Sequence, residues 1–207
     1  MADYKVLAEV GESLIGVIWQ GIQADPALFA LINNPDLISL QSPVELEDDN
    51  DPALLSVYLY RVAEDPYLKN QPASTLTGTG GQLHKAPMAL ELSYLITPLL
   101  NVARDRQIVL GKIMQLLYDR PYLEGGDLLG SLGADSPLRI VFNSLSADDM
   151  YRLWHAVGSD HRLSVTYTVR VSLLESTRQW LVQPVVERDT TYAGKSARQP
   201  AEAVNAV

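Results

Sequence analysis

The sequence predicts an α+β fold in which a mixed, mainly antiparallel central sheet is flanked by helices. Three observations support this. Apolar and polar residues alternate over 88–97, which is typical of a half-buried strand, because successive side chains point to opposite faces. Pro98 ends that strand, and over 102–117 apolar residues recur at helical spacing. A second alternating stretch over 162–174 supplies another strand, so strands and helices share one core.

The length and composition indicate an ordinary globular protein. The chain has 207 residues, of which 47% are hydrophobic and 20% charged, which is enough apolar material to bury a core. We expect residues 1–174 to form a single α+β domain. Residues 175–207 are expected to form a C-terminal arm whose last dozen residues are disordered, because they are small and polar.

The charge balance and the absence of cysteine exclude several classes of function. Lys and Arg total 16 against 25 Asp and Glu, a net charge of −9 that opposes sequence-independent binding to nucleic acid. Without cysteine there can be no disulfide or thiolate metal site. No targeting segment is visible, and no apolar run approaches the ~18 residues of a membrane helix. We therefore expect no direct membrane insertion and a cytoplasmic protein, unless a larger particle carries it out.

The first quarter of the chain predicts one helix and an irregular segment. Apolar residues over 4–22 follow helical spacing, and Gly11 and Gly16 within them indicate either close packing against another backbone or a weak helix. Residues 24–52 contain four prolines and an acidic run over 45–51. That run lacks the glycine and distal glutamate of a calcium-binding loop, so a solvated acidic loop is the better interpretation.

The next stretch predicts an interior strand followed by a loop. Residues 54–62 are apolar on both parities, as in a strand covered on both faces. Residues 63–87 are mostly hydrophilic and predict a flexible loop. Its Thr-Gly-Thr-Gly-Gly run opens no helix and has no Lys-Ser/Thr after it, which argues against phosphate binding. His84 has no second ligand at metal spacing.

After the central strand and helix, the chain predicts a turn-rich segment, a short strand and a capped helix. Residues 119–137 hold four glycines, and 138–142 predict the strand. For the helix over 143–157, Ser146 is the expected N-cap and Asp149 stands at the capping-box position. Capping explains Asp149 and its neighbour Asp148, so we do not interpret them as a catalytic pair.

The last strand and the arm hold the residues that we predict at interfaces. One parity of 162–174 is apolar, and the other is polar and can stay hydrated or meet a polar partner. Trp180 is either a lid on the core or an exposed anchor for a neighbour, since tryptophan is enriched in both settings. We predict no catalytic, metal-binding or cofactor-binding residues. The interface candidates are Ser164, Thr166, Thr168, Arg170, Trp180, Val185, Val186 and Tyr192.

The order of these motifs resembles the Pvc16-like family, also described as a domain of unknown function (DUF4255). The resemblance covers residues 4–194. It is carried by the N-terminal helix, by the helix that contains Leu110-Gly111, and by five segments of the sequence: LLSVYLYRV, LELSYLITPL, SLSADDMYRLWHAV, RLSVTYTVRVSLLES and PVVERDTTYAG. It implies a phage tail-terminator-like fold and no catalytic motif.

The resemblance also implies a structural cap of a contractile injection system, a phage-tail-like particle. Such a cap forms a homohexameric ring at the distal end of tube and sheath, ends elongation, and binds the inner tube and sheath proteins. The resemblance is compatible with a particle that is released and with one that is anchored to a membrane. Ring contacts would use the 63–87 loop, the polar face of 164–172 and the 175–194 arm. The alternatives are a soluble assembly chaperone or adaptor for tube or sheath subunits and, less favoured because the usual motifs are missing, an α/β enzyme.

Overall fold

A six-stranded sheet carries the fold. The computed structural model describes residues 4–47, 52–68, 74–76, 82–84, 88–130, 132, 137–174 and 179–181. In spatial order the sheet contains β1 (Ile38–Ser39), β2 (Leu55–Glu64), β5 (Met88–Pro98), β8 (Val165–Leu174), β7 (Leu138–Phe142) and β6 (Tyr122–Leu123). β1 runs parallel to β2 and all other pairs are antiparallel, which confirms the mixed, mainly antiparallel sheet.

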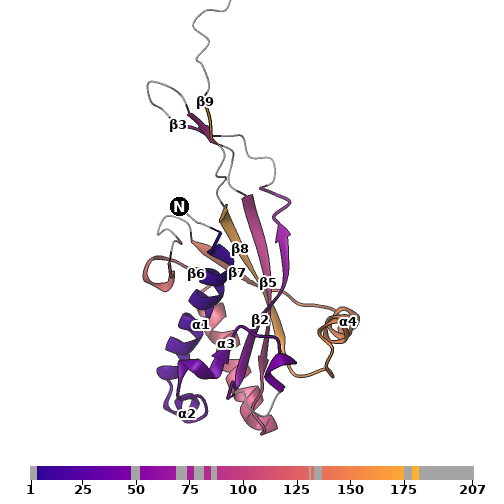
Figure 1. Ribbon diagram of the computed structural model, residues 1–207. Helices are drawn as coiled ribbons and strands as arrows, with labels where there is room; N and C mark the ends of the chain where they lie inside the picture. Colours follow the sequence, from indigo (N-terminus) through magenta and orange to yellow (C-terminus); the bar gives the residue numbers. More distant parts are fainter. Residues whose placement is uncertain are drawn as a thin grey trace, which may run out of the picture.

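Helices α1 and α3 cover one face of this sheet (Figure 1). The helices are α1 (Val6–Gln23), α2 (Pro26–Phe29), α3 (Ala103–Asp119) and α4 (Ala147–Val157), with 3-10 turns at Pro35–Leu37, Glu45–Glu47 and Gly125–Asp127. Register places Leu92 beside Val169 and Tyr94 beside Tyr167, on the face that α1 and α3 cover. The predicted helices 4–22 and 102–117 are confirmed, and so is the strand 138–142.

The central strand β5 is more deeply buried than its alternation predicted. Leu92, Tyr94 and Ile96 lie in the core as expected, but Ser93 and Thr97 of the opposite parity are also buried. The expectation of a half-buried strand is therefore wrong for most of β5. β5 lies in the middle of the sheet between β2 and β8, so the side chains of both neighbouring strands reduce the exposure of its own side chains. β2 is less buried than predicted. Only its first three residues are buried, while Arg61 and Val62 are exposed, so the expectation of a strand covered on both faces is wrong for its second half.

The predicted flexible loop over 63–87 contains two strands, β3 (Ser74–Leu76) and β4 (Gln82–His84), so that prediction is wrong for these residues. They pair with each other and with β9 (Gln179–Leu181) in a small second sheet of order β3-β4-β9. Three-residue strands are held by backbone hydrogen bonds to their neighbours and show no detectable period in sequence. The turn-rich segment likewise contains β6, two residues long.

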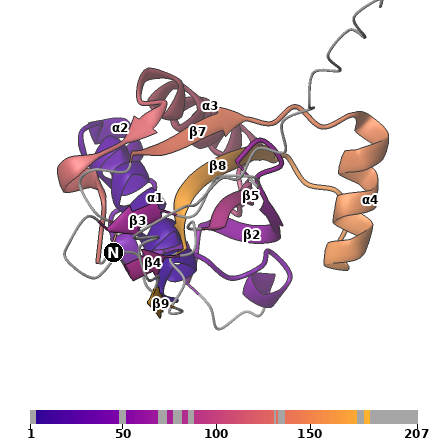
Figure 2. The same cartoon turned by 90° about the horizontal axis from the view of Figure 1, so that it is seen from above.

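Helix α4 begins where its capping signals predicted. The Ser146 hydroxyl oxygen accepts the Asp149 backbone N–H at 3.1 Å, and the hydroxyl donates to the Asp149 carboxylate at 2.6 Å. Gly158 ends the helix in the left-handed region, at φ +87°, with its N–H donating to the Trp154 carbonyl. Figure 2 shows α4 standing apart from α1 and α3.

The two helix glycines that suggested close packing differ. A Cβ at Gly11 would lie 2.9 Å from a methyl group of Leu40, whereas a Cβ at Gly16 would meet no atom within 4 Å. The neighbour of Gly11 is therefore a side chain and not a backbone. For Gly16 the alternative of a locally weak helix is the one that the structure supports. Gly21, not singled out from the sequence, is as crowded as Gly11, with a Cβ at 2.7 Å from Leu116.

We expect Gly16→Ala to raise the free energy of unfolding by about 0.5–1 kcal/mol, because alanine loses less backbone entropy in a helix interior. Gly21→Ala is the matched control within the same helix. The increase in its free energy of unfolding should be smaller, or become a decrease, because the Leu116 side chain must move to make room for the new methyl group. Urea denaturation of both variants measures this difference, and equal stabilisation by the two would contradict the packing of Gly21 against Leu116.

Candidate interaction surfaces

The sheet face opposite α1 and α3 is polar and partly exposed. Register aligns two rows across it: Ala63, Glu91, Arg170 and Arg139 form one, and Arg61, Ser93, Thr168 and Val141 form the other. We call these eight residues the polar face. Arg61 and Arg139 are exposed, and Thr168 and Arg170 are half-buried. Three guanidinium groups thus gather on one surface of a protein whose net charge is −9.

Arg170 is fixed by an ion-pair network. Its Nε and Nη2 atoms each lie 3.0 Å from Oε1 of Glu91, and its Nε lies 4.0 Å from the Asp65 carboxylate. Asp65 is buried and accepts the Tyr67 backbone N–H at 2.8 Å, while the Tyr67 ring lies 5.9 Å from the guanidinium. The network offsets the repulsion between Arg170 and Arg139, which stand directly opposite each other in the register.

Two predicted interface residues of the same strand make contacts inside the chain. Ser164 accepts the indole N–H of Trp154 at 3.2 Å. Thr166 is 1% exposed, donates its hydroxyl to the Asn143 carbonyl, and accepts the Asn143 N–H through its own backbone. Both residues hold the chain where it enters and leaves α4. On this strand, Thr168 and Arg170 are the interface candidates that lie on the polar face.

The small sheet continues the order of the large one beyond the Met88 end of β5 (Figure 1). Along the chain β4 precedes β5, and β9 follows β8. β4 pairs antiparallel with β9, just as β5 pairs antiparallel with β8. The registers Met88↔Leu174 and Gln82↔Leu181 show that the two ladders run almost in step. Trp180 lies in β9 with Leu83 as its backbone partner. Val185, Val186 and Tyr192 lie outside the described residues.

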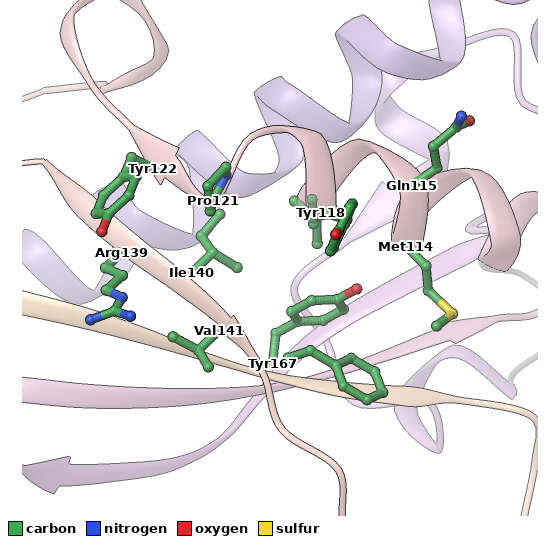
Figure 3. A pocket seen from close by; sticks show the side chains of 11 residues that line it. Met114, Gln115, Tyr118, Pro121, Tyr122, Arg139, Ile140, Val141 and Tyr167 are labelled. Carbon is green, nitrogen blue, oxygen red and sulfur yellow. The ribbon is translucent and has the colours of Figure 1, made fainter.

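An apolar groove with a volume of about 920 Å³ opens between α3 and the edge of β7, and residues of both faces of β7 line it, including Arg139 and Val141 of the polar face. Figure 3 shows Met114 and Tyr118 of α3 facing Ile140 and Tyr167 of the strands across it. The rings of Phe142 and Tyr167, which line the groove, pack edge to face with their centroids 5.4 Å apart. Sequence reasoning missed this groove because its lining comes from α3, β6, β7 and β8, and no contiguous pattern marks it.

No group in the described part of the chain stands out as catalytic. Within those residues no three His, Asp or Glu side chains gather as metal ligands would, and no helix is long and apolar enough to cross a membrane. Burial raises the pKa of the Tyr94 hydroxyl, which has no hydrogen-bond partner there. Tyr94 lies in the core and not in the groove.

Comparison with known proteins identifies a family and several solved structures, including the two that follow. The family model described as the Pvc16 N-terminal domain matches residues 9–188. The chain is similar to the sheath/tube terminator of an extracellular contractile injection system, PVC, in its extended state, with 18% identity and a TM-score of 0.58 over 93% of this chain. It is also similar to the tube-terminating cap of the anti-feeding prophage, with 22% identity and a TM-score of 0.52 over 75% of this chain.

The chain spans 65% of the length of the first of these proteins and 53% of the second. At these identities the likeness is one of fold, and it agrees with the predicted tail-terminator-like architecture. No curated protein matches the chain.

Arg170→Met should lower the free energy of unfolding by about 1–2 kcal/mol, because it leaves the buried Asp65 carboxylate without its cation, and partial exposure of Arg170 limits the loss. Arg61→Met is the control on the same face, where the structure shows no ion pair among the described residues. Its effect should stay within about 0.5 kcal/mol. Chemical denaturation compares the two, and equal losses would show that the Arg170 network contributes nothing.

Proposed function

Because the chain belongs to the family of the Pvc16 N-terminal domain, we propose that it is a structural cap that ends the tube and sheath of a contractile injection system. The observation that carries this proposal is the match over 93% of the chain to a protein described as a sheath/tube terminator. A second protein of similar fold is described as a tube-terminating cap. Two proteins that share this fold are therefore named for the same position in their particles.

We further propose that the cap is a homo-oligomeric ring of six copies that binds both tube and sheath proteins. A closed ring needs heterologous contacts, in which two different surfaces of one chain meet in successive copies. The polar face, the small sheet with β9 and the apolar groove supply different surfaces of different chemistry. Two separate uncovered surfaces on one chain support a ring, because large exposed patches on a protein usually mark sites where it binds a partner.

The role proposed here is structural and not catalytic. It rests on what the two similar proteins are named for, a terminator and a cap. The first of them belongs to an extracellular system, whereas we predict that this chain joins its particle in the cytoplasm. Its release or its attachment to a membrane would then follow the fate of the particle.

Cells that make the particle without this chain should produce tubes and sheaths of irregular length, because nothing ends their growth. Supplying the full chain in trans should restore a narrow length distribution. Electron microscopy of negatively stained particles measures both distributions. A narrow distribution without the chain would contradict a terminating role.

A chain that ends after Leu181 keeps β9 and should unfold at the same temperature as the full chain, since none of the described elements is removed. We expect it to be lost from particles, because Val185, Val186 and Tyr192 are proposed contacts of the arm. Val185→Asp combined with Val186→Asp in the full-length chain should have the same effect. Mass spectrometry of purified particles reads out the incorporation, and normal incorporation of the truncated chain would remove the arm from the interface.

A further inference from the structure

We propose that the apolar groove between α3 and β7 receives the protruding α4 of a second copy of this chain, so that groove and helix form the repeating contact of the ring. The inference rests on the ring proposed above and adds the two surfaces that close it. Each copy carries one groove and one helix, so each contact uses the groove of one copy and the helix of the next.

The groove has the properties of a helix-binding site. Its walls include partly exposed Met114, Val141 and Phe142, at 37%, 37% and 48%, and its volume of about 920 Å³ accommodates several side chains. Tyr118, 85% exposed, also lines the groove, so these side chains form a contiguous exposed apolar patch, which marks an interaction site more than a single exposed ring would. Aromatic and methionine side chains are enriched where proteins bind one another.

One border of the groove is an open strand edge. β6 pairs only with Leu138 and Arg139 of β7, and the Ile140 N–H donates to the Pro121 carbonyl at 2.8 Å. Beyond this point, Val141 and Phe142 have no strand neighbour on that side among the described residues. Among the described residues, no strand therefore covers the groove at Val141 and Phe142, the end of β7 from which the chain continues to α4.

Helix α4 has the properties of the matching partner. Its apolar side chains recur at positions i, i+3, i+4 and i+7, the spacing of helices that bind in grooves: Met150, Leu153, Trp154 and Val157. Trp154 alone among the residues of α4 is buried, and its indole is held by Ser164 of the return segment. Tyr151 is 65% exposed, and nearby Leu163 is 43% exposed. The helix thus buries Trp154 against its own chain and leaves Met150, Leu153 and Val157 half-buried, while Tyr151 and nearby Leu163 face solvent.

The anchoring of α4 opposes its docking into its own groove. The residues before it are tied to β8 by the two hydrogen bonds between Asn143 and Thr166, and the residues after it by the bond between Trp154 and Ser164. If α4 moved into the groove of its own chain, the hydrogen bonds on both sides of the helix would break. Figure 2 shows α4 and α3 apart, so the two surfaces are presented to different neighbours.

Charge also favours this pairing. Arg139 is the single charged side chain that lines the groove, and it has no carboxylate within ion-pair distance among the described residues. The first turn of α4 presents Asp148 and Asp149, and the ion pair of Asp148 with Arg152 is exposed and therefore weak. An acidic helix start meeting Arg139 would select the direction in which α4 enters the groove.

The absence of cysteine from the chain permits a direct test. In the full-length protein, made in cells together with the other particle components, Met114→Cys is combined with Tyr151→Cys and a short thiol cross-linker is added. We expect a ladder of covalent dimers, trimers and larger species on a denaturing gel, because each copy is joined to the next. Each single-cysteine variant should give no species beyond a dimer.

A matched control combines Met114→Cys with Phe29→Cys, since Phe29 is 41% exposed and lies outside the groove, α4 and every surface proposed above as an interface. This pair should give no ladder. An internally cross-linked monomer from the test pair, or the same ladder from the control pair, would overturn the proposal. Thermal unfolding of every variant verifies that each one folds.

The result separates this interface from the cap function. If the chain is found at the end of particles and the test pair gives no ladder, the groove contact is wrong and the cap stands. If the ladder forms while mature particles lack the chain, the contact stands and the cap is wrong.

Discussion

The antiparallel pairing of β5 with β8 fixes which side chains face the core of this protein and which face outward. Their register places Leu92 beside Val169 under α1 and α3, and it places Glu91 beside Arg170 on the opposite face. A slip by one residue would exchange these two sets, because side chains alternate along a strand. The apolar contacts of the inner face make that slip unfavourable, and the polar face is a consequence of the same register. The small sheet continues both strands nearly in step, so its position also depends on this pairing.

The two faces of the sheet differ in how they can meet a partner. On the polar face, Arg170 is already paired with Glu91 and Asp65, so a partner that bound this residue would exchange or share existing interactions. The groove is different, because its aromatic and methionine side chains are exposed to water at a free-energy cost that a partner would remove. A cap that must hold its own ring together and also bind tube and sheath needs both kinds of surface. Permanent contacts favour apolar burial, and contacts made once at the end of assembly can be polar.

Those parts of the fold whose signals are local could be predicted from the sequence. Alternation located β8, helical spacing located α1 and α3, and the Ser146 cap located the start of α4. The failures have physical reasons. β3, β4 and β6 are two or three residues long and depend on partners distant in sequence. Thr166 was predicted on an outward face, but the turn at Asn143 covers it. The groove arises from four elements at once, and no segment of the sequence contains it.

Imaging the ends of intact particles tests most directly whether this chain terminates a contractile particle. Particles purified from cells that make the full-length chain would be studied by electron cryomicroscopy with averaging of each end, and their subunits counted by quantitative mass spectrometry. We predict a ring of this chain at one end only, in contact with the last tube and sheath subunits, at six copies per particle. Mature particles that lack the chain, while it remains bound to free tube or sheath subunits, would contradict the terminating role and indicate an assembly chaperone.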